Sequence, residues 1–242
     1  MSTIPIPDRI VSNGYPTSDG KPMAETDRHR ELMNELIHTL GRFYRDQKRI
    51  YVTGNLLLFY VEGDKRKHLS PDVMVVKGVR KGERLNYLVW QEGKAPQFVI
   101  ELTSSSTRRE DTRKKYDLYR DTLKVKEYFL FDPFGDYLDP RLQGHRLSKG
   151  VYQPIPLLNN RLPSRETGLH LEAAGNALRL WNPETGTWLP TPEEEREQEA
   201  RARRQAEEQR DQEARARQQA EQENARLRAE LEQLRRRRNG QN

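Results

Sequence analysis

The first regular pattern of apolar positions lies between residues 26 and 46. Apolar side chains recur there at steps of three and four, the spacing that places them on one face of an α-helix. This face contains Leu32, Met33, Leu36, Ile37, Leu40, Phe43 and Tyr44. The pattern predicts an amphipathic helix that packs one side against a core.

Short runs rich in β-branched and aromatic residues follow and predict β-strands. They are RIYVTG at 49–54, LLLFYV at 56–61, HLSPDVMVV at 68–76, NYLVW at 86–90 and QFVIELT at 97–103. The last run is almost continuously apolar, which is typical of a central strand with both faces buried. Because proline has no amide hydrogen to donate, Pro71 in the third run marks an edge, a bulge or the first residues of that strand.

Helical spacing returns in residues 106–123, whose apolar side consists of Tyr116, Leu118, Tyr119 and Leu123. Thr107 and Glu110 have the spacing of a capping box at the start of this helix. A further strand, EYFLFDP at 127–133, ends at a proline. Residues 98–132 therefore predict a strand–helix–strand unit with two parallel strands. Strand-like pieces separated by turn signals fill residues 137–190 and predict a hairpin-rich β-extension. The fold class that we expect is α/β, with a mixed sheet flanked by helices.

The C-terminal segment differs in composition. EARARRQAEEQ at 199–209 returns as EARARQQAEQE at 213–223, an offset of 14 residues or two heptads. Acidic residues precede arginines by four positions, which stabilises a helix by about 0.2–0.5 kcal/mol per pair. The spacing of Leu227, Leu231 and Leu234 fits a coiled-coil seam, but arginine and glutamate occupy earlier seam positions. A long helix is predicted, either as a single solvated helix or as a parallel dimeric coil with Asn224 in the seam.

These patterns divide the chain into three parts. Residues 1–22 contain four prolines and predict an extended N-terminal arm, residues 23–190 form the folded domain, and residues 191–242 form the charged helical tail. The tail carries 13 arginines and 13 acidic residues, so the formal net charge of +6 belongs to the first 190 residues. A basic domain weakly indicates a polyanionic partner.

Composition excludes several classes of site. The chain has no cysteine, which rules out disulfides, zinc–thiolate sites and cysteine nucleophiles. Its first residues lack a basic segment followed by an apolar run, so we expect no secretory signal. The longest apolar run, LLLFYV, is too short to span a bilayer. We therefore expect a cytoplasmic protein with no membrane partner.

Two carboxylates stand out because their neighbours are apolar. Asp72 precedes VMVV, and Glu101 ends FVIE. Burial of an unpaired carboxylate costs several kcal/mol, so such groups are normally paired or bind a metal. On neighbouring strand ends, the two acids could hold a hard divalent cation such as Mg²⁺, with the carbonyl oxygen of Leu102 as a further ligand. Such an ion would polarise a phosphoryl oxygen and supply a hydroxide nucleophile.

A cation for the same site comes from the helix that follows. Lys115 shares one face with Asp111 and Tyr119 at spacings of four, and this face can turn back over the strand end. A lysine there could orient the attacking water or offset charge on a phosphate. Lys114 points about 100° away from that face.

Each residue taken alone also fits an ordinary structural role. An aspartate after a proline often ends a ladder, a lysine on a helix is often solvated, and His29 fits a satisfied, half-buried imidazole. The combination is what favours a functional site: an acid in a strand, a second acid at a strand end about thirty residues later, a helix with a lysine, and another strand.

This order resembles the PD-(D/E)XK nuclease superfamily, which has the restriction-endonuclease-like fold. More narrowly, the chain is similar to the bacterial putative restriction endonuclease family of unknown function. The segments that carry the resemblance, within about residues 23–170, are SPDVMVV, VIELTSSST, DTRKKYDLY and EYFLFDP. The superfamily pattern places a lysine two residues after the second acid, where this chain has Thr103, whereas the narrower family is similar to this chain in placing it on the next helix.

The resemblance implies a Mg²⁺-dependent endonuclease that cleaves DNA, with Mn²⁺ as an alternative ion. Asp72, Glu101 and Lys115 would be catalytic, and the metal ligands would be Asp72, Glu101, Leu102 and, from the start of the first helix, Glu25. Two other functions stay open. One is a catalytically weak or inactive nucleic-acid-binding module on a nuclease fold. The other is an interaction protein whose C-terminal helix makes a homodimer.

Overall fold

A six-stranded mixed sheet organises the folded unit in this computed structural model, which describes residues 13–18, 26–104 and 107–239. The strand order is β1 (Ile50–Thr53), β4 (Val73–Lys77), β6 (Phe98–Leu102), β7 (Glu127–Phe131), β8 (Leu142–Ser148) and β9 (Val151–Pro154). β6 and β7 are parallel, and the other neighbours are antiparallel. The expected mixed α/β fold and its parallel strand–helix–strand unit are thus confirmed.

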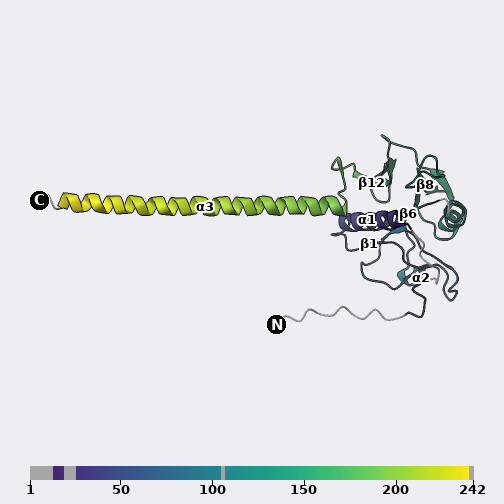
Figure 1. Ribbon diagram of the computed structural model, residues 1–242. Helices are drawn as coiled ribbons and strands as arrows, with labels where there is room; N and C mark the ends of the chain where they lie inside the picture. The colour runs from purple at the N-terminus through teal and green to yellow at the C-terminus, as the bar shows by residue number, and fades with distance from the viewer. Residues whose placement is uncertain (1–12, 19–25, 105–106, 240–242) are drawn as a thin grey trace. The chain divides into compact units, whose positions relative to one another are not determined.

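The predicted N-terminal helix is α1 (Asp27–Phe43), shown with the sheet in Figure 1. The Thr26 side chain caps it by accepting a hydrogen bond from the His29 N–H at 3.2 Å. Its apolar face is buried in a core with alternate residues of β4 and β6, including Val73, Val75 and Ile100. Full burial of each such side chain contributes roughly 1.5–3 kcal/mol.

The other face of the sheet buries the intervening residues, Met74, Val76 and Val99, together with Tyr119. Tyr119 comes from the predicted helix after β6, which contains two π-helical turns, η1 (Glu110–Lys115) and η2 (Leu118–Thr122). Because side chains alternate along a strand, Glu101 points to the same face as Val99, the face that this helix covers. The alternation therefore directs Glu101 toward the helix that carries Lys115.

Three local predictions differ from the structure. HLSPDVMVV is two strands, β3 (His68–Leu69) and β4, because the proline-containing link interrupts the ladder. NYLVW forms β5 (Tyr87–Leu88) and then turns into the short helix α2 (Val89–Glu92). The predicted capping box is not formed. The Thr107 hydroxyl oxygen accepts a hydrogen bond from the Ser104 N–H at 3.1 Å, and the Glu110 N–H donates to the backbone carbonyl of Thr107 instead of its hydroxyl.

The predicted β-extension is divided between two sheets. β8 and β9 complete the central sheet, whereas a separate four-stranded sheet has the order β10 (Leu162–Pro163), β11 (His170–Ala174), β12 (Ala177–Asn182) and β13 (Thr187–Trp188). Leu171 and Leu180 of that sheet join the same core as α1. A third sheet consists of β3, β2 (Leu58–Phe59) and β5.

The predicted N-terminal arm lies outside the described residues except for 13–18. Tyr15 in this part packs against the folded domain, with its ring centroid 4.9 Å from that of Phe59. Its backbone carbonyl accepts a hydrogen bond from the Asn86 side chain at 3.3 Å. The described part of the predicted arm therefore contacts the folded domain through Tyr15.

The second unit, residues 192–242, is separate from the unit formed by residues 1–191. It contains α3 (Pro192–Asn239), a helix of 48 residues, as the sequence predicted. Acidic and basic side chains four residues apart form ion pairs along it, among them Glu197 with Arg201 at 3.0 Å and Arg203 with Glu207 at 3.3 Å. None of the helices in the described part of the chain has the length and apolar character needed to cross a membrane.

Candidate active site

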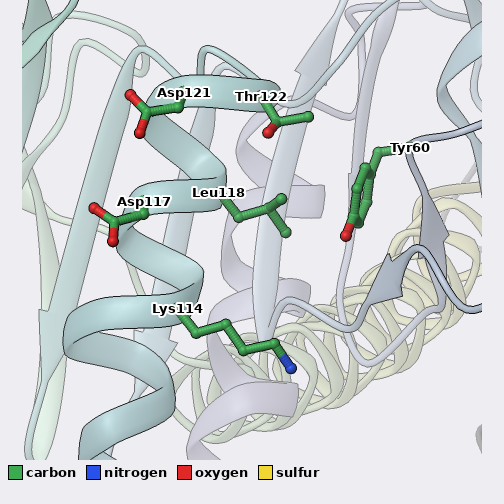
Figure 2. Close-up of a pocket in the computed structure, with 6 residues that line it drawn as sticks. All are labelled: Tyr60, Lys114, Asp117, Leu118, Asp121 and Thr122. Carbon is green, nitrogen blue, oxygen red and sulfur yellow. The ribbon is translucent and has the colours of Figure 1, made fainter.

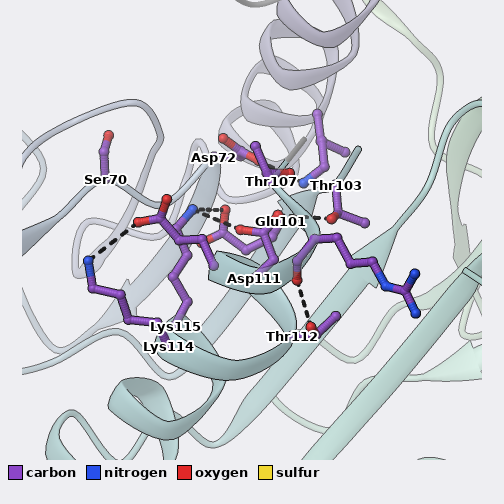
Figure 3. Close-up of polar contacts among 12 residues, drawn as sticks. Ser70, Asp72, Glu101, Thr103, Thr107, Asp111, Thr112, Lys114 and Lys115 are labelled. Carbon is purple, nitrogen blue, oxygen red and sulfur yellow. Dashed lines mark hydrogen bonds and ion pairs between the residues drawn. The ribbon is translucent and has the colours of Figure 1, made fainter. Parts of the chain in front are cut away.

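The two predicted acids lie at adjoining strand ends (Figure 3). Asp72 immediately precedes β4, and Glu101 is the next-to-last residue of β6. Because β4 and β6 are antiparallel, with Val73 opposite Ile100, the start of one strand lies beside the end of the other. Asp72 Oδ2 accepts a hydrogen bond from the backbone N–H of Leu102 at 2.7 Å. The two carboxylates are thus held on adjacent strands by the sheet itself.

Glu101 is fully buried, and each of its carboxylate oxygens has a donor. The Tyr119 hydroxyl donates to Oε1 at 2.6 Å, and the Lys115 ammonium lies 2.8 Å from Oε2. Burial raises the pKa of Glu101 well above its ordinary value; the charge of Lys115 opposes this shift, and Asp72 and Asp111 add to it.

The pKa of Asp72 is shifted in the opposite direction. Burial alone would raise its pKa, but His29, Lys115 and the Leu102 N–H favour the charged form and hold the pKa below its ordinary value. The His29 Nε2 atom lies 3.3 Å from Asp72 Oδ1, so the imidazole noted in the sequence faces this carboxylate. Two acids of one site therefore have pKa values displaced in opposite directions, a pattern common among catalytic carboxylates.

Lys115 reaches the site from η1, on the helix face that the sequence indicated. Its ammonium contacts Glu101 and also lies 3.3 Å from Asp111 Oδ1. Burial would lower the pKa of Lys115, but the neighbouring carboxylates outweigh it and raise the pKa, so the side chain is positively charged at neutral pH. Lys114 points away, as expected, and its exposed ammonium lies 3.8 Å from Glu110.

Three further residues contact the site, although no role was predicted for them from the sequence. Asp111 was placed on the Lys115 face but not counted among the site residues. Thr103 follows β6 and donates its hydroxyl hydrogen to Asp111 Oδ2 at 2.8 Å, and its oxygen is hydrogen-bonded to the Tyr137 hydroxyl. The four-residue spacing between Asp111 and Lys115 could have identified Asp111 as a contact of the lysine. Thr103 and Tyr137 come from loops, where periodicity carries no information.

The donor chemistry of the site suits a hard cation. The carboxylates of Asp72 and Glu101 provide oxygen ligands, and Mg²⁺ is commonly held by one or two carboxylates while it keeps several waters. Within residues 13–18, 26–104 and 107–239, no group of three or more histidine and acidic side chains is arranged to hold a metal. Leu102 lies beside Glu101 at the end of β6. Glu25 lies outside the described residues, so its place in the ligand set stays a prediction.

A hollow of about 390 Å³ lies between the same helix and Tyr60 (Figure 2). It is lined by Tyr60, Lys114, Asp117, Leu118, Asp121 and Thr122. Tyr60 comes from the segment that follows β2 and faces the helix across the hollow. The helix therefore presents Lys115 to the site carboxylates and the neighbouring Lys114 to this hollow.

Comparisons with known proteins give one family. The Uma2 family, described as putative restriction endonuclease, matches residues 15–174, a range that includes all three predicted catalytic residues. No curated protein matches this chain. Among solved structures, it is similar to a putative nuclease belonging to DUF820 from Anabaena variabilis ATCC 29413, with a TM-score of 0.47 and 17% identity over 64% of this chain and 83% of that chain. The family match extends over more than half of the sequence and supports a nuclease function in general terms. The chain belongs to the Uma2 family of putative restriction endonucleases.

Proposed function

We propose that this protein is a Mg²⁺-dependent endonuclease that hydrolyses phosphodiester bonds of DNA. The observation that carries the proposal is the meeting of the buried Glu101 carboxylate with the mostly buried Asp72 carboxylate and Lys115 ammonium at the ends of two adjacent strands. Asp72 is bonded to the residue that follows Glu101, and Lys115 lies 2.8 Å from Glu101. Charges that are mostly shielded from water are costly to keep, so their concentration at these strand ends favours a chemical role over a purely structural one.

Asp72 and Glu101 would hold the metal, with the Leu102 carbonyl and Glu25 as further candidate ligands. A bound Mg²⁺ would polarise the phosphoryl oxygen and lower the pKa of a water molecule. The Leu102 N–H and His29 keep the Asp72 carboxylate ionised and fixed in position. The Tyr119 hydroxyl fixes the position of the Glu101 carboxylate, so the two acids are oriented before any ligand arrives.

Lys115 supplies the fixed positive charge of the proposed mechanism. Its ammonium is mostly buried, where an electrostatic interaction is stronger than in water. We propose that it orients the attacking water and offsets the negative charge that develops on the phosphate. Removal of one preorganised donor of this kind typically lowers kcat by about 10²–10³-fold.

DNA as the substrate is supported by charge. The net charge of +6 lies in residues 1–190. Near the site, the helix that carries Lys115 has four exposed cationic side chains: Arg108, Arg109, Arg113 and Lys114. Cations of this kind bind the phosphate backbone irrespective of sequence and make the affinity sensitive to salt. We therefore expect cleavage to weaken steeply as the salt concentration rises.

A cleavage assay tests the proposal. Supercoiled plasmid and single-stranded circular DNA are incubated with wild type, Glu101→Ala or Lys115→Ala in Mg²⁺, Mn²⁺ or EDTA. Glu110→Gln, which changes an exposed acid on the same helix, is the matched control. Cutting that requires the metal, is abolished in Glu101→Ala and Lys115→Ala, and persists in Glu110→Gln would support the proposal. Equal cutting by all four proteins would refute the assignment of this site.

A second function, a nucleic-acid-binding module without nuclease activity, is favoured by one observation. The Lys115 ammonium and the Tyr119 hydroxyl each donate a hydrogen bond to Glu101, so both oxygens of this carboxylate have a partner without a metal. Such a module would bind DNA in a salt-dependent manner and would not cleave it. Calorimetry with Mn²⁺ distinguishes the two: heat of binding that is lost in Glu101→Ala favours the nuclease, and DNA binding with no metal binding favours the module.

The C-terminal helix supports a proposed homodimer. Leu227 and Leu231 of α3 are 50% and 56% exposed, although both are large apolar side chains. Their spacing matches a coiled-coil seam, so a second copy of this helix would cover them. Sedimentation of the full chain compared with a Leu227→Gln/Leu231→Gln variant tests the dimer. A dimeric wild type with a monomeric variant supports it, and two monomers would contradict it.

A further inference from the structure

Asp111 is a buried carboxylate to which the proposed metal chemistry assigns no role. Its side chain is 3% exposed. One carboxylate oxygen lies 3.3 Å from the Lys115 ammonium, and the other accepts the Thr103 hydroxyl at 2.8 Å. The backbone carbonyl of Asp111 accepts the Tyr128 hydroxyl at 2.9 Å. Both the main chain and the side chain of this residue are therefore fixed.

Lys115 needs such a fixed partner to serve as a preorganised charge. A lysine side chain is flexible, and its ammonium carries three rotatable donors. Glu101 alone would fix one direction of that ammonium. Asp111, one helical turn before Lys115, adds a second carboxylate from a different element, since Glu101 belongs to β6 and Asp111 to η1. The ammonium is thereby held between the strand and the helix.

Thr103 connects this arrangement to the sheet. It is 1% exposed, and its backbone N–H donates to the Phe131 carbonyl at 2.8 Å, which extends the pairing of β6 with β7. Because the single hydroxyl hydrogen of Thr103 goes to Asp111, the Tyr137 hydroxyl is the donor in the hydrogen bond that they share. Tyr137 in turn lies in the loop after β7, with its N–H bonded to Asp132 at 3.0 Å. The contacts thus join the ends of two parallel strands to the helix.

We propose that Asp111 is a positioning residue, which holds the Lys115 ammonium in place while Thr103 and Tyr137 hold Asp111. The proposal rests on the proposed function for its catalytic consequence, although the contact between Asp111 and Lys115 can be tested without it. Asp111 acts through Lys115 and touches neither metal nor substrate. A loss of kcat with an unchanged affinity for metal is the expected signature, because misplacement of a catalytic group by about 1 Å can cost roughly 10²-fold.

The experiment compares Asp111→Asn with Glu110→Gln, a matched amide substitution at the adjacent exposed acid. Thr103→Val and Thr103→Ser test the next contact, because valine removes the hydroxyl and serine keeps it. Three quantities are measured for each protein: kcat and KM for plasmid cleavage, the Mn²⁺ affinity by calorimetry, and the ¹⁵N NMR signal of the Lys115 Nζ atom. The signal is assigned by its absence in Lys115→Arg.

We expect Asp111→Asn to lower kcat by about 10- to 100-fold and to move or broaden the Lys115 signal. The Mn²⁺ affinity should stay within about twofold of wild type, and Glu110→Gln should change none of the three quantities. Thr103→Val should show a smaller loss of kcat, and Thr103→Ser should recover most of it. If Asp111→Asn does not fold, the comparison of Thr103→Val with Thr103→Ser still tests the proposal.

Two results would overturn the positioning role. An unchanged Lys115 signal in Asp111→Asn would show that the carboxylate does not hold the ammonium. A loss of Mn²⁺ affinity in Asp111→Asn well beyond twofold would make Asp111 a metal ligand instead. If wild type cleaves no nucleic acid, the proposed function fails, and the NMR comparison still decides whether Asp111 fixes Lys115.

Discussion

Asp72 and Leu102 are joined across two strands, because a carboxylate oxygen of Asp72 accepts the backbone N–H of Leu102 at 2.7 Å. This bond places the Asp72 side chain one residue away from Glu101. The backbone of β6 therefore helps to fix the acid on β4, and the distance between the two carboxylates is set by the sheet rather than by flexible side chains.

Substitution of Asp72 tests this relationship. Asp72→Asn keeps an oxygen that can accept from Leu102 but removes the negative charge. We expect DNA cleavage to fall by at least about 10²-fold, because the charge is needed for metal binding, while the melting temperature changes by only a few degrees. Thermal unfolding and cleavage are measured on the same preparation. Cleavage at the wild-type rate would contradict the assignment of Asp72.

Gly54 is predicted to be essential for the position of Asp72. A Cβ atom at residue 54 would lie 1.8 Å from the backbone oxygen of Asp72 and 2.7 Å from Ile37 Cδ1. Gly54→Ala must therefore shift the backbone of Asp72, and we expect a loss of both stability and activity. Gly41→Ala is the control, since nothing lies within 4 Å of a Cβ atom there and alanine favours a helix. Chemical unfolding should show destabilisation for Gly54→Ala alone.

Tyr119 should stabilise the fold through its hydrogen bond to Glu101. Tyr119→Phe removes a donor from a fully buried carboxylate, which costs about 1–3 kcal/mol. In a domain of this size the melting temperature should fall by roughly 2–4 °C per kcal/mol. Tyr116→Phe is the same substitution on the same helix at a half-buried position. Equal melting temperatures for the two variants would argue against a contribution from the bond to Glu101.

Asp132 gives the fold a defined pH dependence. Its carboxylate accepts hydrogen bonds from the backbone N–H groups of Phe134, Gly135, Tyr137 and Leu138. Burial would raise the pKa of Asp132, but these four donors outweigh it and hold the pKa below its ordinary value. A folded-state pKa below the unfolded value means that the stabilisation is complete above the unfolded pKa, about 3.9, and is lost as the pH falls through the folded value.

We therefore expect Asp132→Asn to be less stable than wild type at pH 7, by about 1–3 kcal/mol. The difference in unfolding free energy should shrink as the pH falls below about 4. Urea unfolding of both proteins from pH 7 to pH 3 measures this difference, with Asp136→Asn at an exposed neighbouring position as the control. A difference that stays constant over this range would contradict the role given to the carboxylate.

The sequence predicted the elements whose patterns are long, and it missed those that depend on distant contacts. The periodicity before Tyr44 defined α1 to within a few residues. The apolar runs around Ile100 and Phe129 predicted parallel neighbours, because only a crossover helix separates them. Pro71 was expected to mark an edge, a bulge or the first residues of a single strand, because whether it separates two strands depends on tertiary pairing. The capping box at Thr107 failed because Ser104 competes for the same hydroxyl.

In the candidate site, too, the residues in regular patterns were predicted and those that depend on distant contacts were missed. Glu101 was selected because it is a carboxylate at the end of an apolar run, and Lys115 because helix periodicity places it on one face with Asp111 and Tyr119. Asp111 shared that helix face, yet its role depends on the hydroxyl of Thr103, which no sequence pattern connects to it. Tyr137 reaches the site only because the loop after β7 folds around Asp132.

The most direct test of the account is cleavage of supercoiled plasmid by wild type and Glu101→Gln, side by side in Mg²⁺ and in EDTA. Glutamine keeps the size of the side chain and removes the charge, so the fold should be retained, as circular dichroism can verify. The account predicts cutting by wild type in Mg²⁺, none in EDTA, and none by the variant in either. Cutting by Glu101→Gln at the wild-type rate would show that the nuclease chemistry, if present, lies elsewhere in the chain.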